Sequence, residues 1–276
     1  MTSDNWVNFD CDSALHENIT VNAVNPYIAF DLKRFSDCYL LGNEVEDNPI
    51  PESMRACAEI EQEIESIKNK SDDWDRIDVL KILAWKTGNI NHIASRYEFQ
   101  NTGRLDFVYK NNHWSEENLT AKIGRYSFDS ERFVELADRI INIRRNYRER
   151  EDIPEVWDGL MEIYEGFNGI GPVYMITLMY FITMGAKPIF DRFALAAIVA
   201  IQLRDNNRVI SCGSEISCVL PGRDRIDRVR NLINEDSVYG WYCAQLADIF
   251  PNERWRDREV DRALWVYGHY FKPRYR

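Results

Sequence analysis

The sequence predicts an all-α fold with two helical lobes. Several segments carry apolar residues at helical spacing between capping residues, and we find neither the alternation typical of a strand ladder nor an internal repeat. With 276 residues, 45% of them hydrophobic, the chain has enough apolar material for two lobes that share a cleft. We expect a helical barrel over residues 72–186 and a second lobe formed by residues 1–71 and 187–276.

The first third of the chain contains two amphipathic patterns. Residues 1–50 show little periodicity and predict irregular chain or short helices. From Pro51 onward, Ile60, Ile64 and Ile67 recur at helical spacing, with acidic residues on the opposite face. The next segment predicts a helix that begins after an N-cap at Ser71 and ends at Gly88.

The segment 127–151 predicts a long helix with an arginine-rich end. Phe133, Leu136 and Ile140 repeat at helical spacing and are expected to face inward. The second half of this helix carries Arg139, Arg144, Arg145, Arg148 and Arg150. These arginines fit either a solvated helix end that complements the helix dipole or a surface that contacts phosphate.

The second half of the chain predicts further helices. A helix opened by Pro154 precedes an apolar helix over residues 173–184, and Asp191 then caps an alanine-rich helix. The apolar run from Val173 to Ala186 is too short to cross a bilayer, so we expect a buried helix and no membrane partner. After a polar loop at 205–222 come an arginine-rich helix start and a closing helix near the C-terminus.

Charge and cysteine usage narrow the class of protein. The formal net charge of −11 argues at first against a nucleic-acid partner, because phosphate binding depends on Lys and Arg. The acidic excess is mostly N-terminal, however, and 19 of the 21 basic residues after position 130 are arginines, so a local phosphate-facing surface stays open. The six cysteines include no C-x-x-C pair, and Cys212 and Cys218 lack further metal ligands at suitable spacing. We expect free thiols, no metal site and a cytoplasmic location.

A two-glycine turn is the most distinctive local motif. Asn168, Gly169, Ile170 and Gly171 join two predicted helices, and glycine lets the backbone amides of such a turn face outward. Amides at the start of a helix can bind a phosphate oxygen, while Ile170 would anchor the turn in the core. By itself this motif also fits ordinary close packing of two helices.

Asp191 follows the turn at a defined interval. It comes twenty residues after Gly171, beyond the apolar helix and the turn Gly185-Ala186-Lys187-Pro188. Over the span from Asn168 to Asp191 the sequence resembles the helix-hairpin-helix DNA glycosylases, the 8-oxoguanine glycosylase-like branch among them. The resemblance implies that the motif lies at the cleft between the lobes, that the partner is DNA carrying a damaged or modified base, and that Asp191 is the catalytic residue.

The sequence departs from that family at informative positions. The bifunctional members carry a nucleophilic lysine where this chain has Val173, and an isopropyl group cannot form a Schiff base. The resemblance therefore implies a monofunctional enzyme that uses water, with Lys187 as a remote alternative nucleophile. Asn168 replaces the usual proline of the hairpin. No four-cysteine loop follows, so we expect no iron–sulfur cluster and no other cofactor, although a structural monovalent cation at the turn is compatible with the resemblance.

A single carboxylate suits the implied reaction. Cleavage of an N-glycosidic bond builds positive charge on the sugar. An ionised Asp191 would either stabilise that charge or orient a water molecule that attacks the sugar. We expect the helix dipole to favour the ionised form. Aspartate is also a preferred N-cap, and a role for Asp191 as a cap alone stays open.

Other site residues follow from the need to hold an extruded base. By resemblance, the candidates for the base pocket are Thr177 on the apolar helix and Trp265 or Tyr267 on the C-terminal helix, although each also fits an ordinary core position. Trp85 and Lys86 are weaker candidates, and His269 reads as a packed or surface histidine. Two other functions stay open: a helix-hairpin-helix module that binds DNA without chemistry, and an all-helical scaffold for protein interactions. The identity of the base and the oligomeric state are not determined.

Overall fold

The computed structural model describes most of the helical part of the chain. The described residues are 29–86, 130–205 and 226–271, without Glu44, Asp236 and Glu253, together with the short strands at 8–9, 19–20, 90–93, 96–99, 105–107, 121–123 and 126–128. These residues are mostly helical, as the sequence predicts.

The chain contacts divide the molecule into two units. The first unit contains Met1–Ala56 and Pro188–Arg276, and the second contains Cys57–Lys187. The sequence predicts a division at residue 72, whereas the helix that begins at Ala58 belongs with the second unit.

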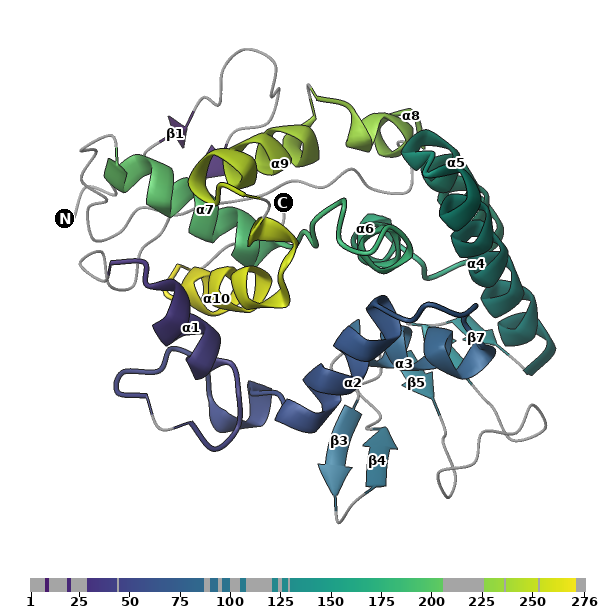
Figure 1. Ribbon diagram of the computed structural model, residues 1–276, viewed down its shortest axis with the longest axis horizontal. Coiled ribbons are helices and arrows are strands. Elements are labelled where there is room, and N and C mark those ends of the chain that lie inside the picture. Colours follow the sequence, from purple (N-terminus) through teal and green to yellow (C-terminus); the bar gives the residue numbers. More distant parts are fainter. Residues whose placement is uncertain are drawn as a thin grey trace. The chain divides into compact units, whose positions relative to one another are not determined.

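The second unit contains five longer helices (Figure 1). They are α2 (Ala58–Lys68), α3 (Arg76–Lys86), α4 (Ser130–Arg150), α5 (Ile153–Gly166) and α6 (Pro172–Ile182). Every residue of α6 from Met175 to Ile182 is buried, which confirms the prediction of a buried helix in this segment. Helices α2, α3, α4 and α5 all contact α6, because a helix that is apolar on every side must be covered on every side.

Local sequence explains where these helices begin. Asp152 caps α5 by accepting a hydrogen bond from the Glu155 amide at 3.0 Å, and proline occupies the first turn as predicted. The predicted cap of α3 at Ser71 is wrong. Asp75 and Asp78 instead accept hydrogen bonds from each other's amides at 2.9 and 3.0 Å, a reciprocal cap that starts the helix at Arg76. The predicted end at Gly88 lies outside the described residues.

Short antiparallel strands join α3 to α4. They are β3 (Ile90–Ile93) with β4 (Arg96–Phe99), and a three-stranded sheet of β5 (Leu105–Phe107), β6 (Ala121–Ile123) and β7 (Tyr126–Phe128). Pairing is antiparallel throughout, with Ile90 opposite Phe99 in the first pair. The sequence predicts no strand ladder, so these strands are an addition to the predicted fold.

The first unit packs helices from both ends of the chain (Figure 1). Its elements are β1 (Asn8–Phe9), β2 (Ile19–Thr20), α1 (Leu32–Cys38), α7 (Arg192–Asp205), α8 (Ile226–Arg230), α9 (Val238–Ile249), α10 (Arg258–Gly268) and the 3-10 turns Glu52–Met54, Asn231–Ile233 and Arg254–Arg256. Helix α10 contacts both α1 and α7, and α7 also contacts α9. All residues of α7 from Ala194 to Ala200 are buried, so α7 and α10 form the centre of this unit.

A glycine fixes the distance between the two central helices. A Cβ on Gly268, the last residue of α10, would lie 2.0 Å from the Phe193 carbonyl oxygen. No side chain fits in that space, so glycine allows α10 to approach the first turn of α7. This contact brings the end of α10 beside Asp191, the residue before α7.

Candidate functional site

The two-glycine turn joins α5 to α6, and its central isoleucine is buried as expected. Helix α5 ends at Gly166, α6 begins at Pro172, and Ile170 between the glycines is 1% exposed. Gly169 has a φ of +96°, a conformation that other residues adopt only with strain, whereas Gly171 has an extended backbone. A Cβ on Gly171 would meet no atom within 4 Å, so the chain itself does not require glycine there.

Arginines of α4 support the entry to this turn. Arg132 donates a hydrogen bond to the Gly166 carbonyl oxygen at 2.6 Å and lies 4.1 Å from the centre of the Phe167 ring. Arg139 lies 5.6 Å from the same ring and pairs with Glu135 at 2.9 Å. These two arginines therefore anchor the end of α5, and the charge of Arg139 is paired with the Glu135 carboxylate.

The next two predicted positions lie on α6. Val173 is half-buried. The Thr177 hydroxyl is buried and donates a hydrogen bond to the Val173 carbonyl oxygen at 2.8 Å, inside the helix. The Thr177 hydroxyl is thus hydrogen-bonded to the backbone of its own helix, in the second unit.

Asp191 caps α7, as predicted. Its Oδ1 accepts hydrogen bonds from the amides of Phe193 and Ala194 at 2.8 and 2.9 Å. Its Oδ2 accepts no hydrogen bond from any described residue. The side chain is half-buried, so one oxygen holds the helix start while the other is uncommitted.

An aromatic cluster lies beside Asp191, where α10 contacts the start of α7. The His269 ring stacks on the Phe193 ring with centroids 3.7 Å apart and an interplanar angle of 11°. The Trp265 ring makes edge-to-face contacts with both rings, and its centroid lies 4.2 Å from that of His269 and 6.0 Å from that of Phe193. We call Asp191, Phe193, Trp265 and His269 the α7–α10 cluster.

Burial shapes the electrostatics of this cluster. Burial lowers the pKa of His269 below its ordinary value of 6.5, while the nearby Asp191 charge opposes the shift. His269 is therefore uncharged at neutral pH. Burial also raises the pKa of the Tyr242 hydroxyl on α9, and the Asp191 charge adds to that effect. Two charged side chains lie beside these uncharged aromatic rings: Asp191, and Arg192, whose guanidinium is 4.8 Å from the centre of the Phe193 ring.

The structure separates the two aromatic candidates of α10. Trp265 joins the α7–α10 cluster and is half-buried. Tyr267 is 2% exposed and packs in the core against Phe35 and Phe271, with ring centroids 5.0 and 5.2 Å away. Residues 265 and 269 share one face of a helix, whereas residue 267 points away from it. Trp85, a weaker candidate, donates a hydrogen bond to Glu61 at 2.8 Å within the second unit.

The expectation that His269 is a packed or surface histidine is confirmed, because its ring stacks on Phe193, a residue that the sequence did not single out. The available signal was the spacing of Trp265 and His269, four residues apart in the closing helix, with Gly268 between them. That spacing shows which residues share a helix face. It does not show that α7 lies against that face.

The arginines at the end of α4 are mostly engaged within the chain. Arg145 and Arg148 pair with Asp73 at 2.8 and 3.4 Å, and Arg150 pairs with Glu155 at 3.2 Å. Arg144 is buried and donates hydrogen bonds to the carbonyl oxygens of Lys68, Lys70, Phe181 and Ile182. These partners favour the structural interpretation of the cluster over a phosphate-contacting surface.

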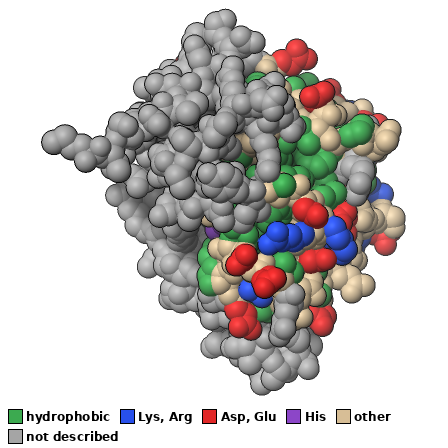
Figure 2. All heavy atoms as spheres, turned by 90° about the vertical axis from the view of Figure 1, so that its left-hand side faces the viewer, with side chains coloured by type: hydrophobic (Ala, Val, Ile, Leu, Met, Phe, Trp, Pro, Cys, Tyr) green, Lys and Arg blue, Asp and Glu red, His purple; other side chains and the backbone are tan. Residues whose placement is uncertain are grey.

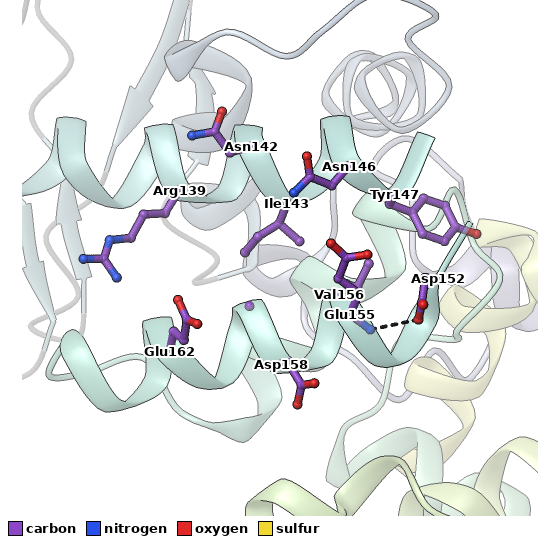
Figure 3. Close-up of a pocket in the computed structure, with 11 residues that line it drawn as sticks. Arg139, Asn142, Ile143, Asn146, Tyr147, Asp152, Glu155, Val156, Asp158 and Glu162 are labelled. Carbon is purple, nitrogen blue, oxygen red and sulfur yellow. Dashed lines mark hydrogen bonds between the residues drawn. The ribbon is translucent and has the colours of Figure 1, made fainter. Parts of the chain in front are cut away.

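A groove lies between α4 and α5, with a volume of about 330 Å³ (Figure 3). Asn142, Asn146 and Arg139 line it from α4, and Glu155, Asp158 and Glu162 line it from α5. With more acidic than basic side chains, this groove does not suit an anion, and of the candidate residues from the sequence it contains only Arg139.

Comparisons with known proteins add no assignment. No protein-family model, curated protein or solved structure matches the chain. Within the described ranges, no helix combines the length and apolar character needed to cross a membrane. Among the same residues, no three His, Cys, Asp or Glu side chains gather closely enough to hold a metal ion.

Proposed function

We propose that this protein binds DNA and excises a base by hydrolysing its N-glycosidic bond, without a covalent enzyme intermediate. The observation that carries the proposal is the turn between α5 and α6. Its middle residue is buried, Gly169 has a positive φ, and Gly171 borders open space at the start of an apolar helix. This combination leaves room for a phosphate oxygen to approach the Gly171 and Val173 amides, whereas Pro172 has no N–H and the amides of Tyr174 and Met175 donate to the Gly171 carbonyl oxygen.

Asp191 supplies the charge for the reaction in this proposal. As the bond from C1′ to the base breaks, the base leaves with the electron pair and positive charge develops on the sugar. The uncommitted Oδ2 of Asp191 stabilises that charge and orients a water molecule, whose oxygen bonds to C1′. One proton of that water passes to the carboxylate and then to the departing base. Val173 cannot form an imine, so hydrolysis ends at an abasic sugar.

The charge of the described surface favours a small number of phosphate contacts. On the face shown in Figure 2, Lys and Arg side chains lie among Asp and Glu side chains. The α4 arginines are also paired with carboxylates or buried. Each phosphate contact contributes about 0.9 to the slope of log K against log salt concentration. We therefore expect a shallow salt dependence for binding to duplex DNA.

The main experiment incubates the protein with oligonucleotides that carry oxidised, alkylated, mismatched or modified bases, followed by alkaline cleavage of abasic sites. Asp191→Asn is the matched variant, because asparagine caps a helix as well as aspartate does but carries no charge. We expect normal folding, unchanged DNA binding and a loss of excision of at least about 100-fold. Borohydride is expected to trap no covalent complex, and strong trapping would contradict the hydrolytic route.

A second candidate function is a module that binds DNA without chemistry. It is favoured by the two amide hydrogen bonds of Asp191, which a purely structural cap also explains. Under this alternative the panel yields no abasic site with any oligonucleotide, while binding to duplex DNA persists.

Gly171 provides the test of the turn. Gly171→Ala adds a methyl group to open space, so we expect an unchanged melting temperature but weaker DNA binding, by about tenfold. Gly166→Ala is the control, because its Cβ also meets no atom within 4 Å and it lies outside the turn, at the end of α5. Equal DNA affinities for both variants would remove the turn from the proposed interface.

A further inference from the structure

The groove between α4 and α5 lies wholly within the second unit and is open to solvent (Figure 3). One face of each helix lines it, at positions 139, 142, 143 and 146 of α4 and at positions 155, 158, 159 and 162 of α5. Residues at such spacing share one side of a helix. Most of these residues are exposed, so a ligand in solution can reach the groove.

Apolar side chains form part of the groove. Ile143 of α4 packs against α5 at Gly159, where a Cβ would lie 2.9 Å from the Ile143 side chain. Val156 and the ring of Tyr147, both buried, also line the groove. Its volume of about 330 Å³ lies at the lower end of the range for ligand sites. The groove therefore offers apolar surface to the stem of a flexible side chain.

Carboxylates without a counter-ion line the same groove. Among the described residues, Asp152, Asp158 and Glu162 form no ion pair, and Asp152 uses one oxygen to cap α5. Asp158 and Glu162 are exposed and four residues apart, and like charges at that spacing repel each other. Figure 3 shows Glu162 extending from α5 toward α4, whereas Asp158 points away from α4. The groove thus keeps negative charge that a bound cation would neutralise.

The other polar side chains of the groove leave this balance unchanged. Arg139 pairs at 2.9 Å with Glu135, which does not line the groove, and Glu155 pairs with Arg150 at 3.2 Å. The Asn146 amide makes no hydrogen bond within the described part of the chain, so it offers both donors and an acceptor to a ligand.

We propose that the α4–α5 groove is a docking site for an arginine-bearing segment of a protein partner. Arginine combines an apolar stem, which suits Ile143 and Val156, with a planar guanidinium whose five N–H groups suit carboxylate and amide oxygens. On α4, the exposed amides of Asn142 and Asn146 lie one turn apart and can bond the peptide groups on either side of the arginine.

Other cations use these features less fully. A metal ion gains nothing from the apolar side chains, and within the described ranges no three side chains gather closely enough to hold one. Lysine has a similar stem, but its ammonium is more strongly hydrated and cannot form the two-pronged contact, so we expect weaker binding. This inference goes beyond the proposed function, because the groove contains neither the two-glycine turn nor Asp191.

The first test follows the δ1 methyl group of Ile143 by NMR in the full chain, labelled at isoleucine methyl groups. The probe is a blocked peptide with one arginine between two pairs of glycines, and it is compared with the same peptide carrying lysine or citrulline. Citrulline keeps the shape of arginine but has no charge. We expect the arginine peptide to shift the Ile143 signal with a Kd about tenfold lower than that of the citrulline peptide, with lysine between them. Equal affinities for the arginine and citrulline peptides would overturn the inference.

Charge-removing variants test which carboxylates hold the arginine. Glu162→Gln should weaken binding of the arginine peptide about threefold, and the double variant with Asp158→Asn about tenfold, because each exposed ion pair contributes modestly. Both side chains are exposed, so we expect the variants to fold normally. Glu165→Gln is the matched control, since Glu165 is also an exposed glutamate of α5 but does not line the groove. Equal affinity of the double variant and the wild type would contradict the proposed site.

A further arm separates a chain segment from a free cation. Ethylguanidinium carries the same charge without a peptide backbone, so it should bind more weakly than the arginine peptide, and equally tight binding would rule out docking of a chain segment.

The outcomes also distinguish this inference from the proposed function. Asp191→Asn should bind the arginine peptide like the wild type, and Glu162→Gln should excise bases at the wild-type rate. If the peptide binds at the groove but no oligonucleotide loses a base, the docking site stands and the glycosylase function fails. If bases are excised but the peptide leaves the Ile143 signal unchanged, the docking site fails and the proposed function survives.

Discussion

Buried Arg144 offers the sharpest test of how the second unit is held together. The side chain is 1% exposed and has no carboxylate in hydrogen-bond contact among the described residues. Its guanidinium donates hydrogen bonds to the carbonyl oxygens of Lys70 at 2.9 Å and Phe181 at 3.0 Å, with longer contacts to Lys68 and Ile182. One arginine thereby satisfies the C-terminal carbonyl groups of α2 and α6, the ends at which the helix dipoles are negative.

The expected loss on Arg144→Met follows from these contacts. Two short hydrogen bonds from a charged donor contribute about 1.5–3 kcal/mol each, and the cation lies 4.2 Å from the centre of the Trp74 ring. Burial opposes this gain and lowers the pKa of Arg144 to about 10, so the side chain stays charged at neutral pH. After removal of that desolvation cost, we expect a net destabilisation of about 3 kcal/mol.

The assay is urea unfolding of the full chain, read together with hydrogen exchange of peptides from α2, α4 and α6. Exchange is needed because two units need not unfold in one step. Arg145→Met is the control, since Arg145 is exposed and pairs with Asp73, and it should change stability by less than about 0.5 kcal/mol. A change below about 1 kcal/mol for Arg144→Met would refute the argument that this arginine caps two helices.

Three further predictions concern the first unit. Gly268→Ala forces a Cβ against the Phe193 carbonyl oxygen and should lower the unfolding free energy by about 3 kcal/mol in denaturant titration; an unchanged midpoint would show that α10 moves away from α7 freely. Asp191→Ala removes the helix cap, and calorimetry should show a loss of about 1 kcal/mol in the free energy of unfolding. Asp191→Asn keeps the cap and should lose much less. Equal losses for the two variants would mean that the charge contributes more to stability than the cap. Because the pKa of His269 is lowered on folding, the unfolded chain binds a proton first as pH falls through 6.5, so stability should decline from that pH down to the folded pKa. His269→Phe should show a smaller decline in the same pH titration, and an identical pH dependence would contradict a buried neutral histidine.

Much of the helical framework was predictable because its signals are local. Asp152 and Pro154 start α5, and Asp191 starts α7, by hydrogen bonds and backbone angles that span only three residues. The buried helix at 173–184 was equally clear, since an apolar run of that length must be covered by other chain. The misplaced cap of α3 shows the limit of local reasoning, because Ser71 and Asp75 both fit an N-cap and only the backbone path selects between them.

The sequence shows that the end of α4 is rich in arginine, but it does not show which groups each arginine contacts. Arg144 and Arg145 are neighbours of the same type, yet one is buried against helix ends and the other is exposed beside Asp73. The difference arises because adjacent helical residues point about 100° apart, so their neighbours come from different parts of the chain. Whether an arginine of this cluster can contact phosphate therefore depends on neighbours that the local sequence does not show.

The sequence by itself determined the helical class, the starts of α5 and α7, the buried anchor at Ile170 and the aspartate that caps α7, since each depends on residues close together in the chain. Only the tertiary structure decided that Phe193, Trp265 and His269 pack on one another while Tyr267 enters the core. The physical reason is the close approach of α10 to α7 at Gly268, a contact between residues 75 positions apart that no local periodicity encodes.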